Sequence, residues 1–108
     1  MILAALVSSS ICKPYSYFID TPINHKEENG ATFKMQYIVD DQYYLADDAV
    51  NKLRPILFYT GNEGGIWDFY ENSGFMTTVL AKEFGGLVVF GEHRYFGDSW
   101  PYPQDVAL

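Results

Sequence analysis

The sequence predicts an α/β fold in which antiparallel first strands precede a strand–helix–strand unit of a mostly parallel sheet. Two continuous apolar runs, residues 55–59 and 87–90, are typical of strands buried on both faces of such a sheet. Between them, apolar residues at helical spacing predict a helix, and before them Thr32–Asp40 alternates as a half-buried strand does. A chain of 108 residues is long enough for one small domain.

The chain begins with a short apolar run followed by small polar residues, MILAALVSSSIC. This start lacks a basic segment, and its apolar part is shorter than the ~7–15 residues usual in a secretory signal. Residues 1–12 are therefore interpreted as either a signal-peptide remnant or a truncated start. Cys12 is the single cysteine, so the chain can hold no internal disulfide and no cysteine-based zinc site, and in a secreted chain it implies a partner elsewhere.

The first strands follow this start. Residues 13–30 are predicted to form an extended arm with turns at Pro14, Pro22 and Asn29-Gly30. Along the strand Thr32–Asp40, the predicted core face carries Phe33, Met35, Tyr37 and Val39, and the mostly solvated face carries Lys34, Gln36 and Ile38. A second short strand is expected over residues 42–45, and a polar connection at Asp47-Asp48 and Asn51-Lys52.

The predicted helix begins after Asn72 or Ser73, either of which can cap its N-terminus. Its apolar stripe consists of Phe75, Met76, Val79, Leu80 and Phe84. Gly85-Gly86 supplies a left-handed stop. Strand, helix and strand together form a right-handed βαβ unit, so the two strands end at the same edge of the sheet.

Two polar loops leave that edge, residues 61–65 and residues 91–95. Open α/β sheets bind their ligands at the carboxyl ends of their strands, so this edge is the candidate site. The glycine loop lacks both the G-x-G-x-x-G spacing and the Gly-Lys-Ser/Thr of a phosphate loop, and Glu63 would repel phosphate. Two interpretations stay open: an oxyanion loop, formed by Gly61, Asn62, Glu63 and Gly64, or a plain tight turn.

The second loop holds tempting catalytic side chains. His93 and Glu92 are successive residues that point to opposite faces, so His93 is expected to form a structural hydrogen bond rather than a dyad. Glu92 and Arg94 are expected to brace the edge, by pairing with each other. Ser99 lies in a G-x-S-x-G-like stretch with Pro101 in the last position, and the following prolines disfavour a nucleophile elbow. No nucleophile is therefore expected in this chain.

Composition excludes several partners. The net charge of −7 argues against nucleic acid, because phosphate binding needs clustered lysine and arginine. No apolar stretch reaches the ~20 residues of a membrane span. No cofactor or metal site is expected.

The loop motifs also resemble a known family. The stretches FYTGNEGGIWDFYENSGFM and LVVFGEHRYFGDSWPY are similar to the family of lysosomal Pro-X carboxypeptidase and dipeptidyl peptidase II, with weaker similarity over residues 32–39 and at Pro22-Ile23-Asn24-His25. Gly65 stands where the family usually carries Asp, and Lys26 where it usually carries an aromatic residue.

The resemblance implies an α/β-hydrolase fold and serine-type cleavage of short peptides next to proline, in a lysosomal or secreted setting. It also implies that the catalytic Ser, Asp and His lie downstream, so that residues 13–108 are an incomplete N-terminal part of the peptidase domain. A peptide substrate and, for the full-length protein, a homodimer are the expected partners. Carboxypeptidase and dipeptidyl peptidase specificity both stay open. So do two alternatives: a catalytically silent interaction module, and another α/β-hydrolase such as an esterase.

Overall fold

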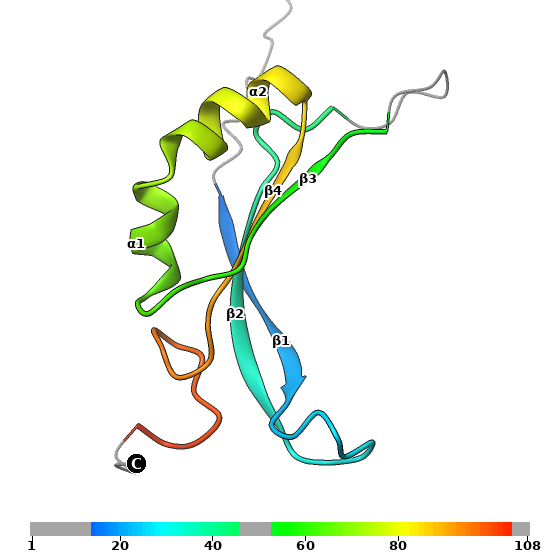
Figure 1. Ribbon diagram of the computed structural model, residues 1–108, viewed down its shortest axis with the longest axis vertical. Helices are drawn as coiled ribbons and strands as arrows, with labels where there is room; N and C mark the ends of the chain where they lie inside the picture. The colour runs from blue at the N-terminus through cyan, green and yellow to red at the C-terminus, as the bar shows by residue number, and fades with distance from the viewer. Residues whose placement is uncertain (1–13, 46–52, 105–108) are drawn as a thin grey trace, which may run out of the picture.

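The computed structural model describes residues 14–45 and 53–104, and the predictions for residues 1–12 and for the polar connection at 47–52 lie outside them. The described strands are β1 (Tyr15–Pro22), β2 (Thr32–Asp40), β3 (Ile56–Tyr59) and β4 (Leu87–Gly91). They form a mixed sheet of order β1-β2-β4-β3 (Figure 1). β2 pairs antiparallel with both β1 and β4, whereas β3 and β4 are parallel. The predicted α/β class is confirmed.

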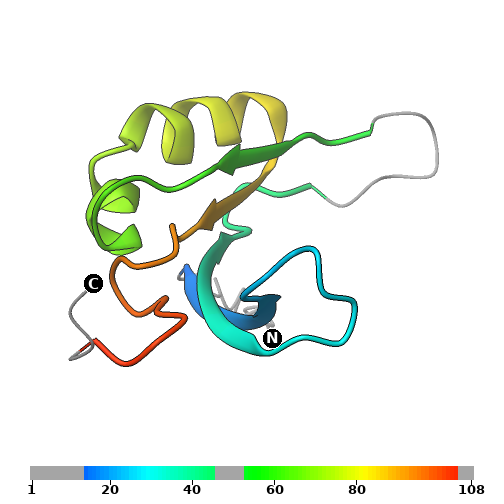
Figure 2. The same ribbon diagram turned by 60° about the horizontal axis from the view of Figure 1, so that its bottom comes forward.

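Three helical segments cover one face of this sheet: α1 (Ile66–Glu71), the π-helical η1 (Phe75–Leu80) and α2 (Ala81–Phe84). They lie together on one side of the strands in both ribbon views (Figures 1 and 2). The core between the two layers consists of Ile38, Ile66, Ala81, Val88 and Phe90, each at most 1% exposed. No helix in the described ranges is both long enough and apolar enough to cross a membrane.

The predicted strand–helix–strand unit is present, with one additional helix. Gly85 ends α2 in the left-handed conformation (φ 57°, ψ 39°), as predicted. The predicted N-cap is wrong. Asn72 Nδ2 donates to Asp68 O at 2.7 Å and Ser73 Oγ donates to Phe69 O at 2.6 Å. Both side chains therefore bond carbonyls of α1, the helix that the sequence analysis missed, instead of capping η1.

The N-terminal arm is more regular than predicted, and the short second strand is absent. Tyr15–Pro22 pairs with β2 along its whole length, so this part of the arm is a strand. Residues 41–44 instead form a turn, with Tyr44 N donating to Asp41 O at 3.0 Å, and Leu45 N donates to Gly85 O at 3.1 Å. The connection between β1 and β2 is closed by a bond from Ile23 N to Ala31 O at 2.9 Å.

The two faces of β2 are reversed relative to the prediction. The helices cover the face that was expected to be mostly solvated. On that face Gln36 is 5% exposed, Ile38 0% and Asp40, which the prediction did not assign to a face, 3%. Asp40 is compatible with burial because its carboxylate is hydrogen-bonded: Oδ2 accepts from Tyr70 OH at 2.6 Å. On the other face only Phe33 is buried, at 6% exposure.

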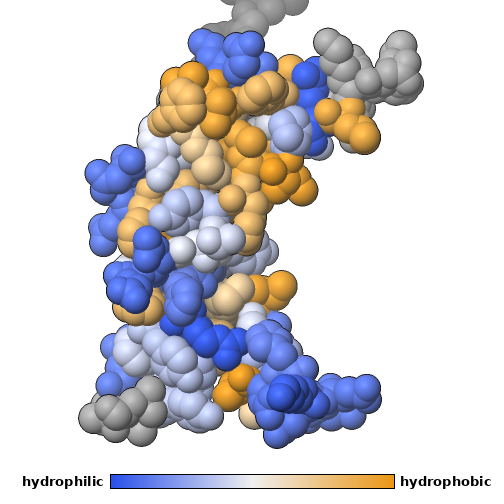
Figure 3. Space-filling view, in the orientation of Figure 1, coloured by the Kyte–Doolittle hydropathy of each residue, from blue (hydrophilic) through white to orange (hydrophobic). Residues whose placement is uncertain are grey.

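That other face of the sheet is apolar and open. Register places Tyr17 opposite Tyr37 and Ile19 opposite Met35, and the two tyrosine rings stack at 5.5 Å. On β3, Ile56 is 65% exposed and Phe58 58% exposed, so the prediction that this strand is buried on both faces is wrong for the described residues. Figure 3 shows apolar side chains gathered in the upper half of the molecule, around η1, α2 and β3.

Candidate functional site

The glycine loop after β3 crosses directly over the end of β4. Gly61 has a φ of +79°, and a Cβ placed on it would lie 2.5 Å from Gly91 O and 2.8 Å from His93 N. Only glycine combines this backbone conformation with so close an approach. The two loops therefore leave the sheet side by side, as the parallel βαβ unit predicts.

Hydrogen bonds within the loop use two of its amides. Glu63 N donates to Asn62 Oδ1 at 2.8 Å, and Gly64 N donates to Asn62 O at 2.8 Å. The Glu63 side chain is exposed. Among the described residues, the Asn62 N–H has no hydrogen-bond partner. If the loop donates to an oxyanion in this conformation, the amides of Glu63 and Gly64 are already occupied, and Gly61 and Asn62 carry the N–H groups that are free among the described residues.

Glu92 is the centre of a buried network that joins three segments. It is 3% exposed. Its Oε2 accepts from Ile66 N, the first residue of α1, at 2.9 Å. Its Oε1 accepts from Asp98 N at 2.9 Å and from Ser99 Oγ at 2.7 Å. Ser99 Oγ in turn accepts from Gln36 N on β2 at 2.8 Å. One carboxylate thus ties the helix after the glycine loop to the second loop and to the sheet.

The same network explains the spacing of the EHRYFGDS stretch. Gly97 has a φ of +53°, and a Cβ on it would collide with the Glu92 carboxylate. Ser99 is fully buried and occupied by its two hydrogen bonds, which fits a structural role. His93 is exposed, and its Nδ1 contacts Arg94 O at 2.7 Å, as expected for a structural hydrogen bond.

Arg94 does not pair with Glu92. Its guanidinium donates to Ile23 O at 3.1 Å and to Pro22 O at 3.3 Å, and contacts His25 Nε2 at 2.9 Å. It also lies 5.2 Å from the centre of the Phe33 ring. Glu92 and Arg94 therefore contact different segments: Glu92 holds α1 and the second loop, and Arg94 holds the connection between β1 and β2.

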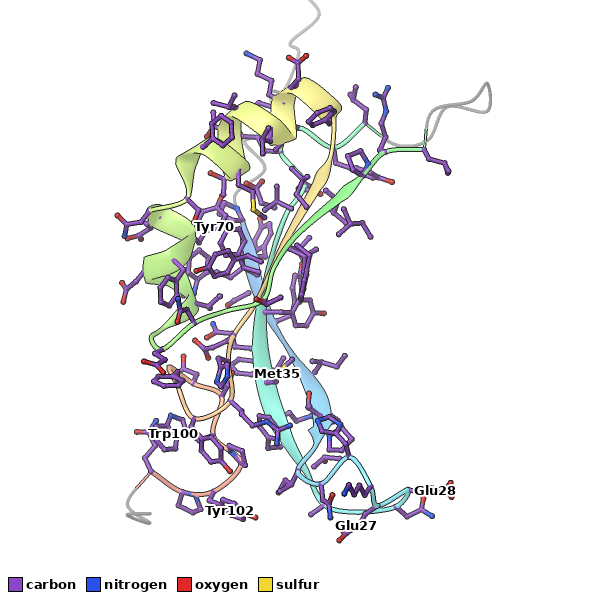
Figure 4. The ribbon with its side chains drawn as sticks, in the orientation of Figure 1. Glu27, Glu28, Met35, Tyr70, Trp100 and Tyr102 are labelled. Carbon is purple, nitrogen blue, oxygen red and sulfur yellow. The ribbon has the colours of Figure 1, made fainter. Side chains whose placement is uncertain are left out.

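A shallow hollow of about 280 Å³ lies on the open face beside these loops, lined by Met35, Phe58, Thr60, Gly91, Glu92, His93 and Arg94. Met35 lies midway along β2 (Figure 4). Within residues 14–45 and 53–104 no cluster of His, Cys, Asp and Glu side chains could hold a metal ion.

The sequence analysis missed one polar pair in the helix layer. Tyr70 on α1 points toward the sheet (Figure 4) and donates to Asp40 Oδ2 at 2.6 Å. Burial raises the pKa of Tyr70 strongly, and the hydrogen bond to Asp40 and its negative charge add to the increase. The pattern on β2 gave a weak signal for this pair, because Asp40 is the last residue of the strand and shares a face with Ile38.

Replacing Tyr70 with phenylalanine is expected to lower stability at neutral pH by about 1–3 kcal/mol, because Asp40 keeps only the Gln42 N–H as a donor. Since the pKa of Tyr70 is raised in the folded chain, the native state holds its proton when the unfolded state loses it above about pH 10. The wild-type advantage should therefore shrink as pH rises further. Urea midpoints of both proteins at pH 8 and pH 11 measure this, and a constant difference would contradict it.

The comparisons with known proteins identify the family. The model of the family described as serine carboxypeptidase S28 matches residues 23–107. The chain belongs to the serine carboxypeptidase S28 family. The match to S28 includes both loops at the carboxyl edge and the connection between β1 and β2 that Arg94 contacts. The predicted resemblance is thus confirmed.

Individual S28 relatives agree. The chain is 42% identical over 89 residues to the lysosomal Pro-X carboxypeptidase of Bos taurus, which covers 82% of this chain and 17% of that protein. It is 47% identical over 74 residues to the Mus musculus protein of the same name, covering 68% and 14%. A prolyl carboxy peptidase like protein 5 of Caenorhabditis elegans is 48% identical over 66 residues, covering 61% and 13%. The chain thus spans less than a fifth of the length of these relatives.

Proposed function

We propose that this chain is the N-terminal segment of a serine-type exopeptidase that cleaves short peptides next to proline. The observation that carries the proposal is the S28 match over residues 23–107, which includes the two adjoining loops. The relatives named lysosomal Pro-X carboxypeptidase support peptide substrates and a lysosomal location. An α/β-hydrolase fold is proposed for the complete domain. The open edge of β3 and the uncovered apolar face support a larger sheet with a second helical layer.

The glycine loop is the proposed contribution of this chain to catalysis. Its position at the carboxyl edge and the free Asn62 N–H support a donor to the oxyanion that forms during acyl transfer. Glu63, which is exposed, orients the loop or meets a substrate amine. Glu92 holds the loop in place by accepting a hydrogen bond from the first amide of α1. Arg94 holds the connection between β1 and β2 against the same edge.

The isolated 108-residue chain is expected to neither hydrolyse prolyl peptides nor react with a fluorophosphonate probe. Ser99 has no exposed surface, and its oxygen is held between Gln36 N and the Glu92 carboxylate, so neither a peptide nor the probe can reach it. Mass spectrometry of the probe-treated chain measures this, with chymotrypsin as a positive control. A specific adduct on Ser99 would contradict it.

The proposal itself is tested on the protein encoded when the reading frame is extended beyond Leu108. We expect a Ser-bearing strand–turn–helix within the next hundred or so residues, and turnover of prolyl peptides by the product. Release of the C-terminal residue would indicate a Pro-X carboxypeptidase, and release of an N-terminal dipeptide a dipeptidyl peptidase. Hydrolysis of acyl esters without peptides would favour an esterase. A cooperatively folding 108-residue product with no extension would favour the interaction module.

A further inference from the structure

Arg94 connects two separate stretches of the sequence, EHRYFG and PINH, both of which resemble the family. It follows β4 in EHRYFG, and its three polar contacts are to Pro22, Ile23 and His25 of the PINH stretch, about 70 residues earlier. We call these contacts the Arg94 clamp. The clamp fastens the connection between β1 and β2 to the carboxyl edge of the sheet, and both segments lie in the lower half of the molecule as drawn in Figure 1.

The contact between Arg94 and His25 is compatible with only one protonation state of the imidazole. A guanidinium has five N–H donors and no acceptor. At 2.9 Å from Arg94 Nη2, the Nε2 of His25 must therefore accept, which places the ring proton on Nδ1. A doubly protonated ring would offer no lone pair and would set two positive charges against each other. The closed clamp thus requires a neutral His25.

The charged groups around His25 do not remove the need for a neutral imidazole in the closed clamp. Arg94 comes from the loop after β4, and His93, on the same loop, contacts the Arg94 carbonyl. Within the connection, Glu27 Oε1 accepts from Asn24 Nδ2 at 3.0 Å, and Figure 4 shows Glu27 and Glu28 at its outer tip. Lys26 is the remaining charge there. Asp20 and Lys34 form an ion pair with each other at 2.8 Å.

Arg94 is held more firmly than His25. Its guanidinium keeps two backbone carbonyls and lies against the buried Phe33 ring, whereas the His25 side chain is exposed. Repulsion would therefore displace the imidazole and the connection that carries it, while Arg94 stays on the sheet. Histidine side chains change charge between about pH 5 and 8.

We propose that the Arg94 clamp is a pH-sensitive latch: protonation of His25 releases the connection of residues 23–31 from the carboxyl edge. The latch is independent of peptidase chemistry, and only its physiological use in an acidic compartment rests on the proposed function. It regulates the order of a segment bordering the candidate site, next to the loop that contains His93 and Arg94.

The test is NMR-detected hydrogen exchange of the 108-residue chain at pH 7.5 and pH 5, normalised to the intrinsic rates at each pH. The reporters are the hydrogen-bonded amides of Ile23, Glu27 and Gly30. We expect their protection to fall about five-fold at pH 5, the factor that corresponds to one lost hydrogen bond of about 1 kcal/mol. In His25→Gln the amide oxygen can still accept from Arg94 but does not titrate, so protection should stay constant with pH. His93 remains in this variant and serves as an internal control.

A second variant reproduces the released state at neutral pH. His25→Lys places a permanent positive charge beside Arg94 and should show at pH 7.5 the protection that wild type shows at pH 5. Equal loss of protection in wild type and His25→Gln would overturn the latch, as would wild-type protection in His25→Lys. A wild-type chain with unprotected reporters already at pH 7.5 would overturn the clamp. None of these readouts depends on catalysis, so they are distinguishable from a failure of the proposed peptidase function.

Discussion

Replacing Glu92 with alanine is expected to cost the chain about 2–6 kcal/mol of folding free energy, at about 1–3 kcal/mol for each of the buried donors, Ile66 N and Ser99 Oγ, that lose their acceptor. The variant leaves the N–H groups of Ile66 and Asp98 and the Ser99 hydroxyl without their acceptor. Ile66 and Ser99 are buried, whereas Asp98 is exposed and its N–H can turn to water. At about 0.05–0.15 kcal/mol of stability per residue, a domain of 108 residues has roughly 5–16 kcal/mol, so this loss would remove a large part of the folding free energy.

Two variants calibrate this result. Glu92→Gln keeps one oxygen for Asp98 N and Ser99 Oγ, but its NH₂ group then faces Ile66 N, so it should lose about 1–3 kcal/mol for one unsatisfied donor. Glu63→Ala changes an exposed carboxylate and should stay within about 0.5 kcal/mol of wild type. Urea unfolding followed by circular dichroism gives the order. If Glu92→Ala were no less stable than Glu63→Ala, the buried network would not be important for stability.

Much of the candidate site could be predicted because it depends on chain direction rather than on side-chain detail. Two apolar runs separated by one helix-length segment imply parallel strands, and parallel strands place their following loops at one edge. In the structure the two loops do adjoin, since a Cβ on Gly61 would lie 2.5 Å from Gly91 O. Gly85 was equally predictable, because a left-handed helix end favours glycine for local steric reasons.

Other features depend on which layer covers which face, and local sequence does not determine that. On β2, both faces carry apolar residues, and the helices happen to cover the face with Ile38, so Gln36 and Asp40 become buried polar residues. The Asp40 carboxylate is bonded to Tyr70, 30 positions away, and the backbone N–H of Gln36 to Ser99, 63 positions away. Glu92 and Arg94 were assigned to the edge from the sequence, but the pairing expected between them was replaced by contacts to three other segments.

Gly97→Ala should be the most damaging glycine substitution in residues 91–99, which comprise the second loop and the turn that follows it. A residue with a side chain at φ +53° costs roughly 1–2 kcal/mol for the left-handed conformation alone. In addition, the new Cβ would collide with the Glu92 carboxylate, and first with Oε2, so the carboxylate must move and its bonds to Ile66 N, Asp98 N and Ser99 Oγ are all disturbed. Each donor left unsatisfied adds about 1–3 kcal/mol. The total expected loss is therefore larger than the conformational cost.

The chain provides a matched control in Gly74. It has a helical conformation (φ −56°, ψ −30°), and a Cβ placed on it meets no atom within 4 Å. Gly74→Ala should leave stability unchanged or raise it by up to about 1 kcal/mol, because alanine restricts the unfolded chain more than glycine does.

Two measurements compare the variants: the urea midpoint and the hydrogen-exchange protection of the Ile66 amide. Both should fall in Gly97→Ala, and neither should fall in Gly74→Ala. Since Ile66 N is bonded to Glu92, a loss of its protection caused by a methyl group at position 97 would show that the carboxylate couples the second loop to the helix that follows the glycine loop. Unchanged Ile66 protection in a destabilised Gly97→Ala would instead confine the effect to the second loop.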